Sequence, residues 1–373
     1  MSQPLPMLSS TRLAAPRGGL ASPLTACADD ATELQRAGPL TGPAVEADGR
    51  IVSADSAGRL TAFDTQTLEL LWAVDMPDWA PEDRVPLICG DTVVTRRDTD
   101  WAVRSLANGE LLHQTVGPRM LMTGAMIHGA GLIGTIFRPE PPLGTFALAR
   151  FDPATGVQDW TAELRTSASV VPTLVGDVVV QSSVSHWLDA HDARTGAALW
   201  SYDVSSIGIR ETPFTPPRGV IPGWPLALGG RLVLPIRFDH WLGLDPASGA
   251  EVWRTRTGSE MPGRATRVGD DRLVILSDGR VQILEAATGA LLADRADSAL
   301  PPGPWGAGVA SASHVFATSV PSGVVVAVSA ESGAVEWISS PGQPTAPDRP
   351  PILTDSHLIA MSTDGTVRLF SAG

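Results

Sequence analysis

One phrase recurs along the whole chain: a short apolar segment, then Asp-x-x-Thr/Ser-Gly, then a second segment that ends in tryptophan. The clearest copies cover residues 146–160, 187–200 and 241–253. Weaker copies cover 60–72, 101–113, 281–293 and 324–337, and a shortened copy covers 367–373. The turn residues of these copies are 40 to 53 positions apart: Leu68, Gly109, Gly156, Gly196, Gly249, Gly289, Gly333 and Gly373. A period in this range is typical of folds that repeat one supersecondary unit.

Each copy predicts a strand, a tight turn and a second strand. The Asp side chain can accept hydrogen bonds from backbone amides two and three residues ahead, and Gly supplies the positive φ that closes the turn. A further pair of predicted strands precedes each copy, as in 170–174 and 178–182. Four antiparallel strands in a repeat of this length predict a β-propeller. We therefore expect an all-β fold of eight four-stranded blades.

The eighth repeat stops after its third predicted strand, so we expect its fourth strand to come from the other end of the sequence. In the other repeats the fourth strand of one blade comes directly before the first strand of the next blade. Residues 31–37 stand in the same place before the first strand of the first blade. Pairing the two ends would remove the exposed edges that an open array leaves. We thus expect one propeller domain over 31–373 and an N-terminal extension over 1–30.

The repeat, with its Ala-x-Asp-x-x-Thr-Gly-x-x-x-Trp pattern, resembles the PQQ-like (quinoprotein-type) β-propeller repeat over about residues 31–373. The copies at Leu68 and Gly289 depart from the pattern because they lack the glycine or the tryptophan. In that family the tryptophan that ends each fourth strand packs between neighbouring blades. The resemblance implies this structural role for five tryptophans: Trp72, Trp160, Trp200, Trp253 and Trp337.

The resemblance to quinoprotein dehydrogenases would imply a pyrroloquinoline quinone, calcium and redox chemistry. Those enzymes resemble longer versions of this fold, with an adjacent cysteine pair over the quinone and an Asn among the calcium ligands. Here Cys27 and Cys89 are not adjacent, and Asn108 lies in a predicted hairpin turn. We therefore expect no cofactor, no metal and no quinone-dependent dehydrogenase activity.

Composition excludes two further classes of function. All 27 residues counted as Lys or Arg are Arg, which excludes Schiff-base lysine enzymes and P-loop NTPases. The net charge is −13 and no basic run is longer than Arg96-Arg97, so a nucleic-acid partner is not expected.

The sequence also gives an expectation for the cellular location. No segment is apolar over the roughly 18 residues that a membrane span needs. Leu24 to Cys27 has the form of a lipoprotein cleavage box, but prolines and arginines interrupt the apolar run that a signal peptide requires before it. We expect a cytoplasmic, monomeric protein, with an exported lipoprotein attached through Cys27 as the alternative.

Propellers bind ligands at the loops over the central channel, so candidate site residues are sought there. Tryptophans outside the packing positions and nearby arginines are candidates for binding: Trp79, Trp224, Trp305, Arg119, Arg210 and Arg237. Trp and Arg suit a recognition surface, since they combine large contact area with directed charge. The alternative is that these loops seal the channel and the tryptophans only fill space.

Three titratable residues near the same loops are candidates for proton transfer: His186, His240 and Glu211. Both histidines begin a His-Trp-Leu phrase at the start of a predicted third strand. They are either remnants of the repeat with a structural role or acid–base groups, since His titrates near neutrality.

Two functions remain open at this point. The first is a non-catalytic scaffold that holds a protein partner on the loop face, which is similar to the outer-membrane assembly lipoprotein of this repeat family. The second is a cofactor-independent lyase, cyclase or isomerase that binds a small organic molecule in a Trp-lined pocket at the channel mouth. The fold does not choose between them, because function depends on the site that the fold carries.

Overall fold

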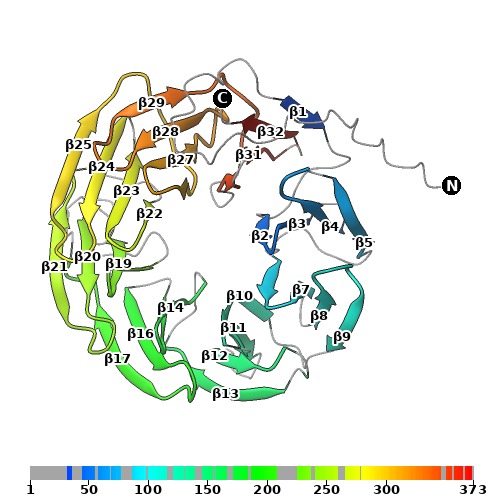
Figure 1. The fold of residues 1–373 in the computed structure, drawn as a ribbon. Helices are drawn as coiled ribbons and strands as arrows, with labels where there is room; N and C mark the ends of the chain where they lie inside the picture. The colour runs from blue at the N-terminus through cyan, green and yellow to red at the C-terminus, as the bar shows by residue number, and fades with distance from the viewer. Residues whose placement is uncertain are drawn as a thin grey trace.

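The computed structural model describes residues 32–35, 44–54, 58–67, 69–76, 86–97, 100–115, 121–129, 131–138, 145–153, 155, 157–165, 171–183, 186–207, 225–236, 240–258, 265–277, 279–345, 350–354, 357–363 and 366–371. These residues form strands and turns, and none of them is helical. The strands make eight separate sheets of four antiparallel strands each, arranged as blades around a ring (Figure 1). The predicted all-β, eight-bladed propeller is confirmed.

The first four complete blades follow the chain order without a crossover. Blade 1 contains β2 (Val45–Ala47), β3 (Arg50–Ala54), β4 (Arg59–Asp64) and β5 (Leu70–Asp75), and blade 2 contains β6 (Leu87–Cys89), β7 (Thr92–Arg97), β8 (Asp100–Ser105) and β9 (Leu111–Thr115). Blade 3 contains β10 (Leu121–His128), β11 (Gly131–Arg138), β12 (Thr145–Phe151) and β13 (Gln158–Glu163). Blade 4 contains β14 (Thr173–Val175), β15 (Val178–Ser182), β16 (Trp187–Asp192) and β17 (Ala198–Asp203).

The remaining blades repeat this order, except for the last. Blade 5 contains β18 (Leu226–Leu228), β19 (Arg231–Ile236), β20 (His240–Leu244) and β21 (Glu251–Arg256), and blade 6 contains β22 (Ala265–Val268), β23 (Arg272–Ser277), β24 (Arg280–Glu285) and β25 (Leu291–Ala296). Blade 7 contains β26 (Val309–Ala310), β27 (His314–Thr318), β28 (Val325–Ser329) and β29 (Val335–Ile338). Blade 8 contains β30 (Ile352–Leu353), β31 (His357–Met361), β32 (Thr366–Ser371) and β1 (Thr32–Gln35).

Blade 8 joins the two ends of the described chain. Strand β1 pairs antiparallel with β32, from Thr32 opposite Leu369 to Gln35 opposite Thr366. This is the closure that the shortened eighth repeat predicts, and it gives β32 a partner on its outer side. The ring is therefore held by backbone hydrogen bonds between segments more than 300 residues apart in the sequence.

The burial of each strand follows its place in the blade. The second and third strands lie inside the sheet between two neighbouring blades, and β27, β28 and β31 are buried along their whole length. The fourth strands are outermost (Figure 1), and their burial alternates, as in β13, where Trp160 is buried and both neighbours are exposed. This difference explains the sequence pattern, since a strand covered on both faces needs a continuous apolar run.

The Asp-x-x-Thr/Ser-Gly turns have the predicted chemistry. In blade 4, one carboxylate oxygen of Asp192 accepts hydrogen bonds from the Arg194 amide at 3.0 Å, the Thr195 amide at 2.8 Å and the Thr195 hydroxyl at 2.9 Å. Gly196 has φ +74°. The hydrogen bonds from Thr195 and Arg194 hold the pKa of Asp192 below its usual value.

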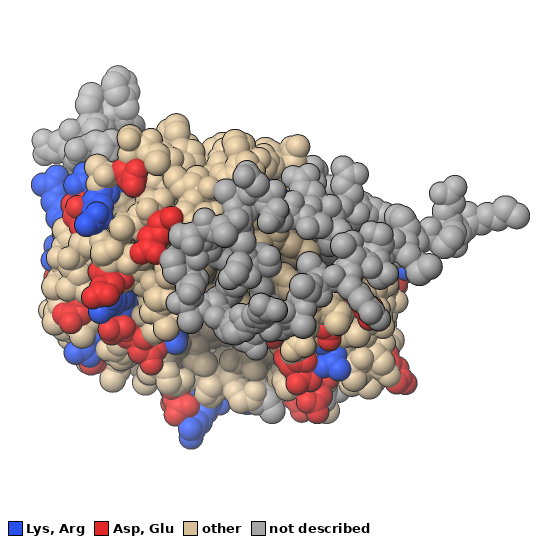
Figure 2. Space-filling view, turned by 45° about the horizontal axis from the view of Figure 1, so that its top comes forward, with Lys and Arg blue, Asp and Glu red and all other residues tan. Residues whose placement is uncertain are grey.

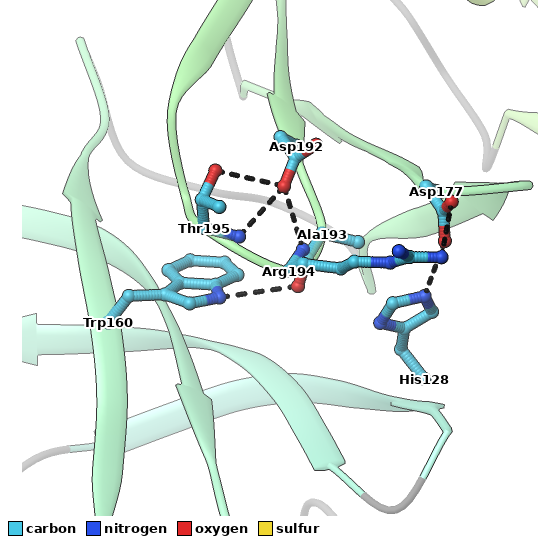
Figure 3. A network of polar contacts seen from close by, with 7 residues as sticks. All are labelled: His128, Trp160, Asp177, Asp192, Ala193, Arg194 and Thr195. Carbon is cyan, nitrogen blue, oxygen red and sulfur yellow. Dashed lines mark hydrogen bonds and ion pairs between the residues drawn. The ribbon is translucent and has the colours of Figure 1, made fainter.

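Tryptophan and glycine pack against each other across the blade boundary. Trp160 of blade 3 donates its indole N–H to the carbonyl of Ala193 in blade 4 at 3.2 Å (Figure 3). A Cβ placed on Gly196 would lie only 2.6 Å from Cε3 of Trp160. The turn glycine therefore meets two requirements at once, a positive φ and the close approach of a neighbouring indole ring.

The same packing recurs at three other boundaries, as the resemblance implies. The indole N–H groups of Trp72, Trp200 and Trp253 each donate to a backbone carbonyl of the next blade, at 3.0, 2.8 and 2.9 Å. Trp337 instead packs edge-on against Phe370, with ring centroids 5.2 Å apart.

Three blades carry another residue at the tryptophan position. His113 pairs with Val103 in blade 2, Ala293 pairs with Ile283 in blade 6, and Thr32 pairs with Leu369 in blade 8, where the other five blades have tryptophan. Gly333 is the turn glycine of blade 7, which follows Ala293 around the ring, and a Cβ placed on it would have its nearest neighbouring atom 3.4 Å away. The turn of blade 7 therefore has room for a Cβ, whereas the indole ring of Trp160 fills that space at the turn of blade 4.

A polar bridge also joins blades 3 and 4. His128 at the end of β10 and Arg194 in the turn of blade 4 both contact the carboxylate of Asp177 (Figure 3). Their distances to its carboxylate oxygens are 3.1 Å and 2.9 Å. Asp177 precedes β15, so this bridge links the first hairpins of two neighbouring blades and adds a polar contact to the Trp160 packing.

Candidate functional site

The two faces of the ring differ in their connections. Links from second to third strands, and from each fourth strand to the next blade, lie on one face, which we call the loop face. The opposite, turn face carries the Asp-x-x-Thr/Ser-Gly turns and the tight hairpins between first and second strands. Six of the predicted site residues lie outside the described residues: Trp79, Arg119, Arg210, Glu211, Trp224 and Arg237.

His186 lies on the loop face immediately before β16. Its side chain is mostly buried, and its Nε2 is 3.9 Å from a carboxylate oxygen of Asp203, at the end of the neighbouring strand β17. Its ring centroid is 5.6 Å from that of Trp187. His186 is therefore held between an acidic and an aromatic side chain of its own blade.

An arginine from blade 3 completes this group. The guanidinium of Arg165 lies 4.8 Å from the ring centre of Trp187, a cation–π arrangement. Its Nε is 3.3 Å from Asp189, and its Nη2 donates to the Ser201 hydroxyl at 3.1 Å. The Ser201 hydroxyl in turn donates to Asp189 at 2.7 Å. We call residues Arg165, His186, Trp187, Asp189, Ser201 and Asp203 the blade 3–4 cluster.

The blade 3–4 cluster has a fixed base and an accessible tip. Asp189 is 8% exposed, whereas 55% of the Arg165 side chain is exposed. The buried carboxylate and the indole ring fix the orientation of the guanidinium, and the exposed part of the side chain lies on the loop face. Such a group can recognise carbonyl or carboxylate oxygens on another molecule.

Sequence reasoning predicted only His186 of this cluster. One signal was present: Asp189 is a carboxylate in the middle of a third strand. The equivalent residues, each paired with the one after the tryptophan position, carry no charge in blades 1–3 and 5–7: Thr61, Ala102, Ala149, Leu242, Gln282 and Val326. In blade 8 the equivalent residue is Arg368, which pairs with Glu33. A buried strand tolerates a carboxylate only when a partner satisfies it, so Asp189 marks a polar site.

His240 does not occupy the position equivalent to His186. Counting from the packing tryptophans, Ala190 pairs with Trp200 and Gly243 pairs with Trp253, so His240 corresponds to Trp187. The two His-Trp-Leu phrases are thus offset by one residue, and an offset of one turns a strand side chain to the other face of its sheet. As a result Trp241 is 1% exposed in the core between blades 5 and 6.

Trp305 is part of the core. It is 2% exposed and packs in a cluster with Val268, Leu276 and Val315 from blades 6 and 7. Its backbone forms a bridge with Ser319. This position favours the alternative that the tryptophan fills space, and it leaves no indole surface for a ligand on the outside.

Blade 7 contains a Ser–His–Glu chain that sequence reasoning missed. The Ser313 hydroxyl and Nδ1 of His314 are 2.8 Å apart, and Nε2 of His314 is 2.9 Å from Glu336. The order matches that of a hydrolase triad. The amides of Ser313 and His314, however, already donate to the Ser311 hydroxyl of the same turn, at 3.4 and 3.0 Å. They are not free to bind an oxyanion, so this chain fastens the β26–β27 hairpin to β29.

The described residues show no cluster of three or more His, Cys, Asp or Glu side chains that could hold a metal ion. No helix capable of crossing a bilayer is found among them. Burial raises the pKa of the Cys89 thiol, which makes it a poor nucleophile. Carboxylates and arginines are interspersed over the visible described surface (Figure 2), with no broad basic area in that view.

Comparison with known proteins places the fold in a family. A family model described as outer membrane protein assembly factor BamB matches residues 15–128, 145–299 and 277–373. The chain belongs to this BamB family. The predicted PQQ-like repeat resemblance is thereby confirmed. No curated protein sequence matches the chain.

Solved structures resemble the BamB-family chain over most of its length. BamB from Moraxella catarrhalis has 16% identity and a TM-score of 0.68, covering 91% of this chain and 98% of that chain. Sqt1 of Saccharomyces cerevisiae has 10% identity and a TM-score of 0.70, covering 91% and 97%. A quinohemoprotein alcohol dehydrogenase from Comamonas testosteroni has 11% identity and a TM-score of 0.65, covering 92% and 76%. At these identities the similarity shows the fold.

Proposed function

We propose that this chain is a non-catalytic scaffold that holds a protein partner on its loop face. The observation that carries the proposal is the blade 3–4 cluster, in which Arg165 lies over Trp187 and keeps 55% of its side chain exposed. Arg and Trp are the residues that most often dominate protein–protein binding energy. The description of the family as an assembly factor supports the same class of function.

The chemistry of the cluster favours recognition over catalysis. Asp189 is occupied by Ser201 and Arg165, and the His186–Asp203 distance of 3.9 Å is too long for a hydrogen bond that would activate the imidazole. The groups that remain accessible are guanidinium donors and an aromatic face. These groups bind a partner's carbonyl or carboxylate oxygens and apolar side chains.

The test is native mass spectrometry of the protein purified gently from its own host, as the unaltered chain and as two variants. Arg165→Ala/Trp187→Ala removes the accessible part of the cluster. Arg267→Ala is the matched control, because its side chain is also 55% exposed and ion-paired, at 2.9 Å to Asp270, but lies beside the turn face.

We expect a partner protein to be retained by the unaltered chain and by Arg267→Ala, and lost from the double variant, with circular dichroism unchanged. Equal retention by both variants would refute the role of the cluster. A small organic molecule retained in place of a protein would refute the scaffold and support the cofactor-independent enzyme.

A further inference from the structure

The exposed large hydrophobic side chains of the described residues are not scattered. All of them lie one to three residues before the tryptophan position of their blade. At this place the outer strand begins, beside the turn face. The residues are Leu70, Leu71, Leu111, Leu112, Val157, Leu199, Val252, Leu291 and Leu292. A position that repeats around the ring has the same geometry in every blade. Differences between blades at this position therefore reflect the residues alone.

Blades 1 and 2 carry the same phrase at this position, Glu69-Leu70-Leu71 and Glu110-Leu111-Leu112. The four leucines are 43%, 46%, 44% and 56% exposed. Blade 6 has a leucine pair at the same place, but alanine precedes it, and blades 3, 4, 5 and 7 have at most one exposed large hydrophobic residue there.

The two leucine pairs lie on either side of a contact between blades 1 and 2. Trp72 directly follows Leu71, and its indole N–H donates to the Leu106 carbonyl in the turn of blade 2 at 3.0 Å. A Cβ on Gly109, two residues before Leu111, would be 2.7 Å from the Trp72 ring. We call Leu70, Leu71, Leu111 and Leu112 the leucine patch. Large exposed apolar side chains gathered in one region of a surface mark interaction sites.

The backbone under the leucine patch is not suited to pairing with another strand. In blade 1, Trp72 pairs with Ala62 and Leu70 with Phe63, so Leu71 is an extra residue in a β-bulge. In blade 2, His113 pairs with Val103 and Leu111 with Arg104, so Leu112 is the extra residue. A bulge interrupts the hydrogen-bonding edge and twists it away. A partner must therefore contact the leucine side chains rather than extend the sheet.

The charge beside the leucine patch is negative. Around the turns at this end of blades 1 and 2, five carboxylates and two arginines have described side chains: Asp48, Asp64, Glu69, Asp91 and Glu110, with Arg50 and Arg104. Arg50 is paired with Asp48 at 2.8 Å, and Arg104 donates to the Gly109 carbonyl at 3.2 Å. Glu69 and Glu110 are exposed next to the leucines, so they select a basic partner.

We propose that the leucine patch binds a cationic amphipathic helix of a partner protein, with its apolar face on the four leucines and its basic residues on Glu69 and Glu110. A helix fits better than a strand because it presents apolar side chains in a row and satisfies its own backbone. The proposal does not depend on the blade 3–4 cluster, since it concerns the other face of the ring and other blades.

The experiment measures binding of a fluorescent model helix of leucine and lysine, with leucine at helical spacing, by anisotropy. We expect Leu70→Ser/Leu112→Ser to weaken binding by about 10-fold or more. Glu69→Gln/Glu110→Gln should weaken binding and reduce its dependence on salt. The matched control is Leu291→Ser/Leu292→Ser, the leucine pair of blade 6, which should bind as the unaltered protein does.

Several results would overturn the proposal. One is absence of binding to the unaltered protein, and another is an equal loss in the blade 6 control, which would show general attraction to an acidic surface. Tighter binding of a leucine–lysine peptide with strand alternation would exclude the helix. A dimer that Leu70→Ser/Leu112→Ser converts to a monomer would assign the patch to self-association. Since these variants leave Arg165 and Trp187 intact, each result is independent of the loop-face test.

Discussion

Replacement of Gly196 by Ala tests the packing that holds neighbouring blades together. The residue has φ +74°, and its new Cβ would lie 2.6 Å from Cε3 of Trp160. A left-handed conformation costs an alanine about 1–2 kcal/mol. Forcing an extra carbon into a packed contact adds about 1–3 kcal/mol. We therefore expect the free energy of unfolding to fall by about 2–5 kcal/mol.

The chain contains the matched control for this experiment. Gly333 occupies the same place in the turn of blade 7 with φ +69°, but the preceding blade has Ala293 instead of tryptophan, and the nearest atom would be 3.4 Å from the new Cβ. Gly333→Ala should show only the backbone cost of about 1–2 kcal/mol. The difference between the two variants isolates the contact with Trp160.

The assay is thermal and urea unfolding of both variants under the same conditions, followed by circular dichroism. A third measurement adds Trp160→Ala to Gly196→Ala. Removing the ring should leave only the backbone cost of the second substitution, so the two effects should be non-additive. Equal losses for Gly196→Ala and Gly333→Ala, or additive effects in the double variant, would refute the view that the turn glycine is needed for the indole.

Three further results are expected. Burial and, second, the hydrogen bond to Glu251 at 2.7 Å raise the pKa of Tyr202 to about 12. The folded state therefore keeps a proton that the unfolded state loses near pH 10, and the free energy of unfolding should fall as the pH rises from about 10 to about 12. The chain has one tyrosine, so phenolate absorbance reports this group alone; a folded-state midpoint near 10 would contradict the burial argument. Burial lowers the pKa of His357 below 6.5, so the unfolded state binds a proton first as the pH falls, and the free energy of unfolding should decline below about pH 6.5. This decline with pH should be less steep in His357→Gln, and an equal decline in both proteins would show that His357 does not cause it. Deletion of residues 1–36 removes β1 and exposes the edge of β32, which should lower the melting temperature and cause self-association in size-exclusion chromatography; an unchanged monomer would show that β1 is dispensable.

The fold could be predicted because its repeating signals are local. Asp192, Thr195 and Gly196 lie within five positions and determine one turn by their own hydrogen bonds and φ. The period then fixes the number of blades, and the unfinished eighth repeat indicates the role of β1. The sequence does not show that Gly196 must also admit the ring of Trp160, because that contact joins two repeats.

The candidate site could be predicted only in part. The identical phrases at His186 and His240 suggested equivalent roles, yet register is set by pairing with Trp200 and Trp253, and this pairing offsets them by one residue. The cation–π contact of Arg165 with Trp187 joins the end of one blade to the third strand of the next. No periodic pattern reports such a contact, because it depends on the angle between blades rather than on the repeat.

The outer strands show how a repeat fold acquires a specific surface. Every complete blade has its bulge at the residue before the tryptophan position, so protection of the sheet edge is common to the ring. At that residue blades 3 and 7 have Asp159 and Glu336, and the other complete blades have an apolar residue, but a second exposed leucine with a glutamate before it is found in blades 1 and 2 alone among them. Since the bulge already prevents edge pairing, leucine is not needed there for the fold, and its exposure does not improve solubility. The pairing of two leucines with a preceding glutamate on two adjacent blades is therefore best explained by recognition of another molecule.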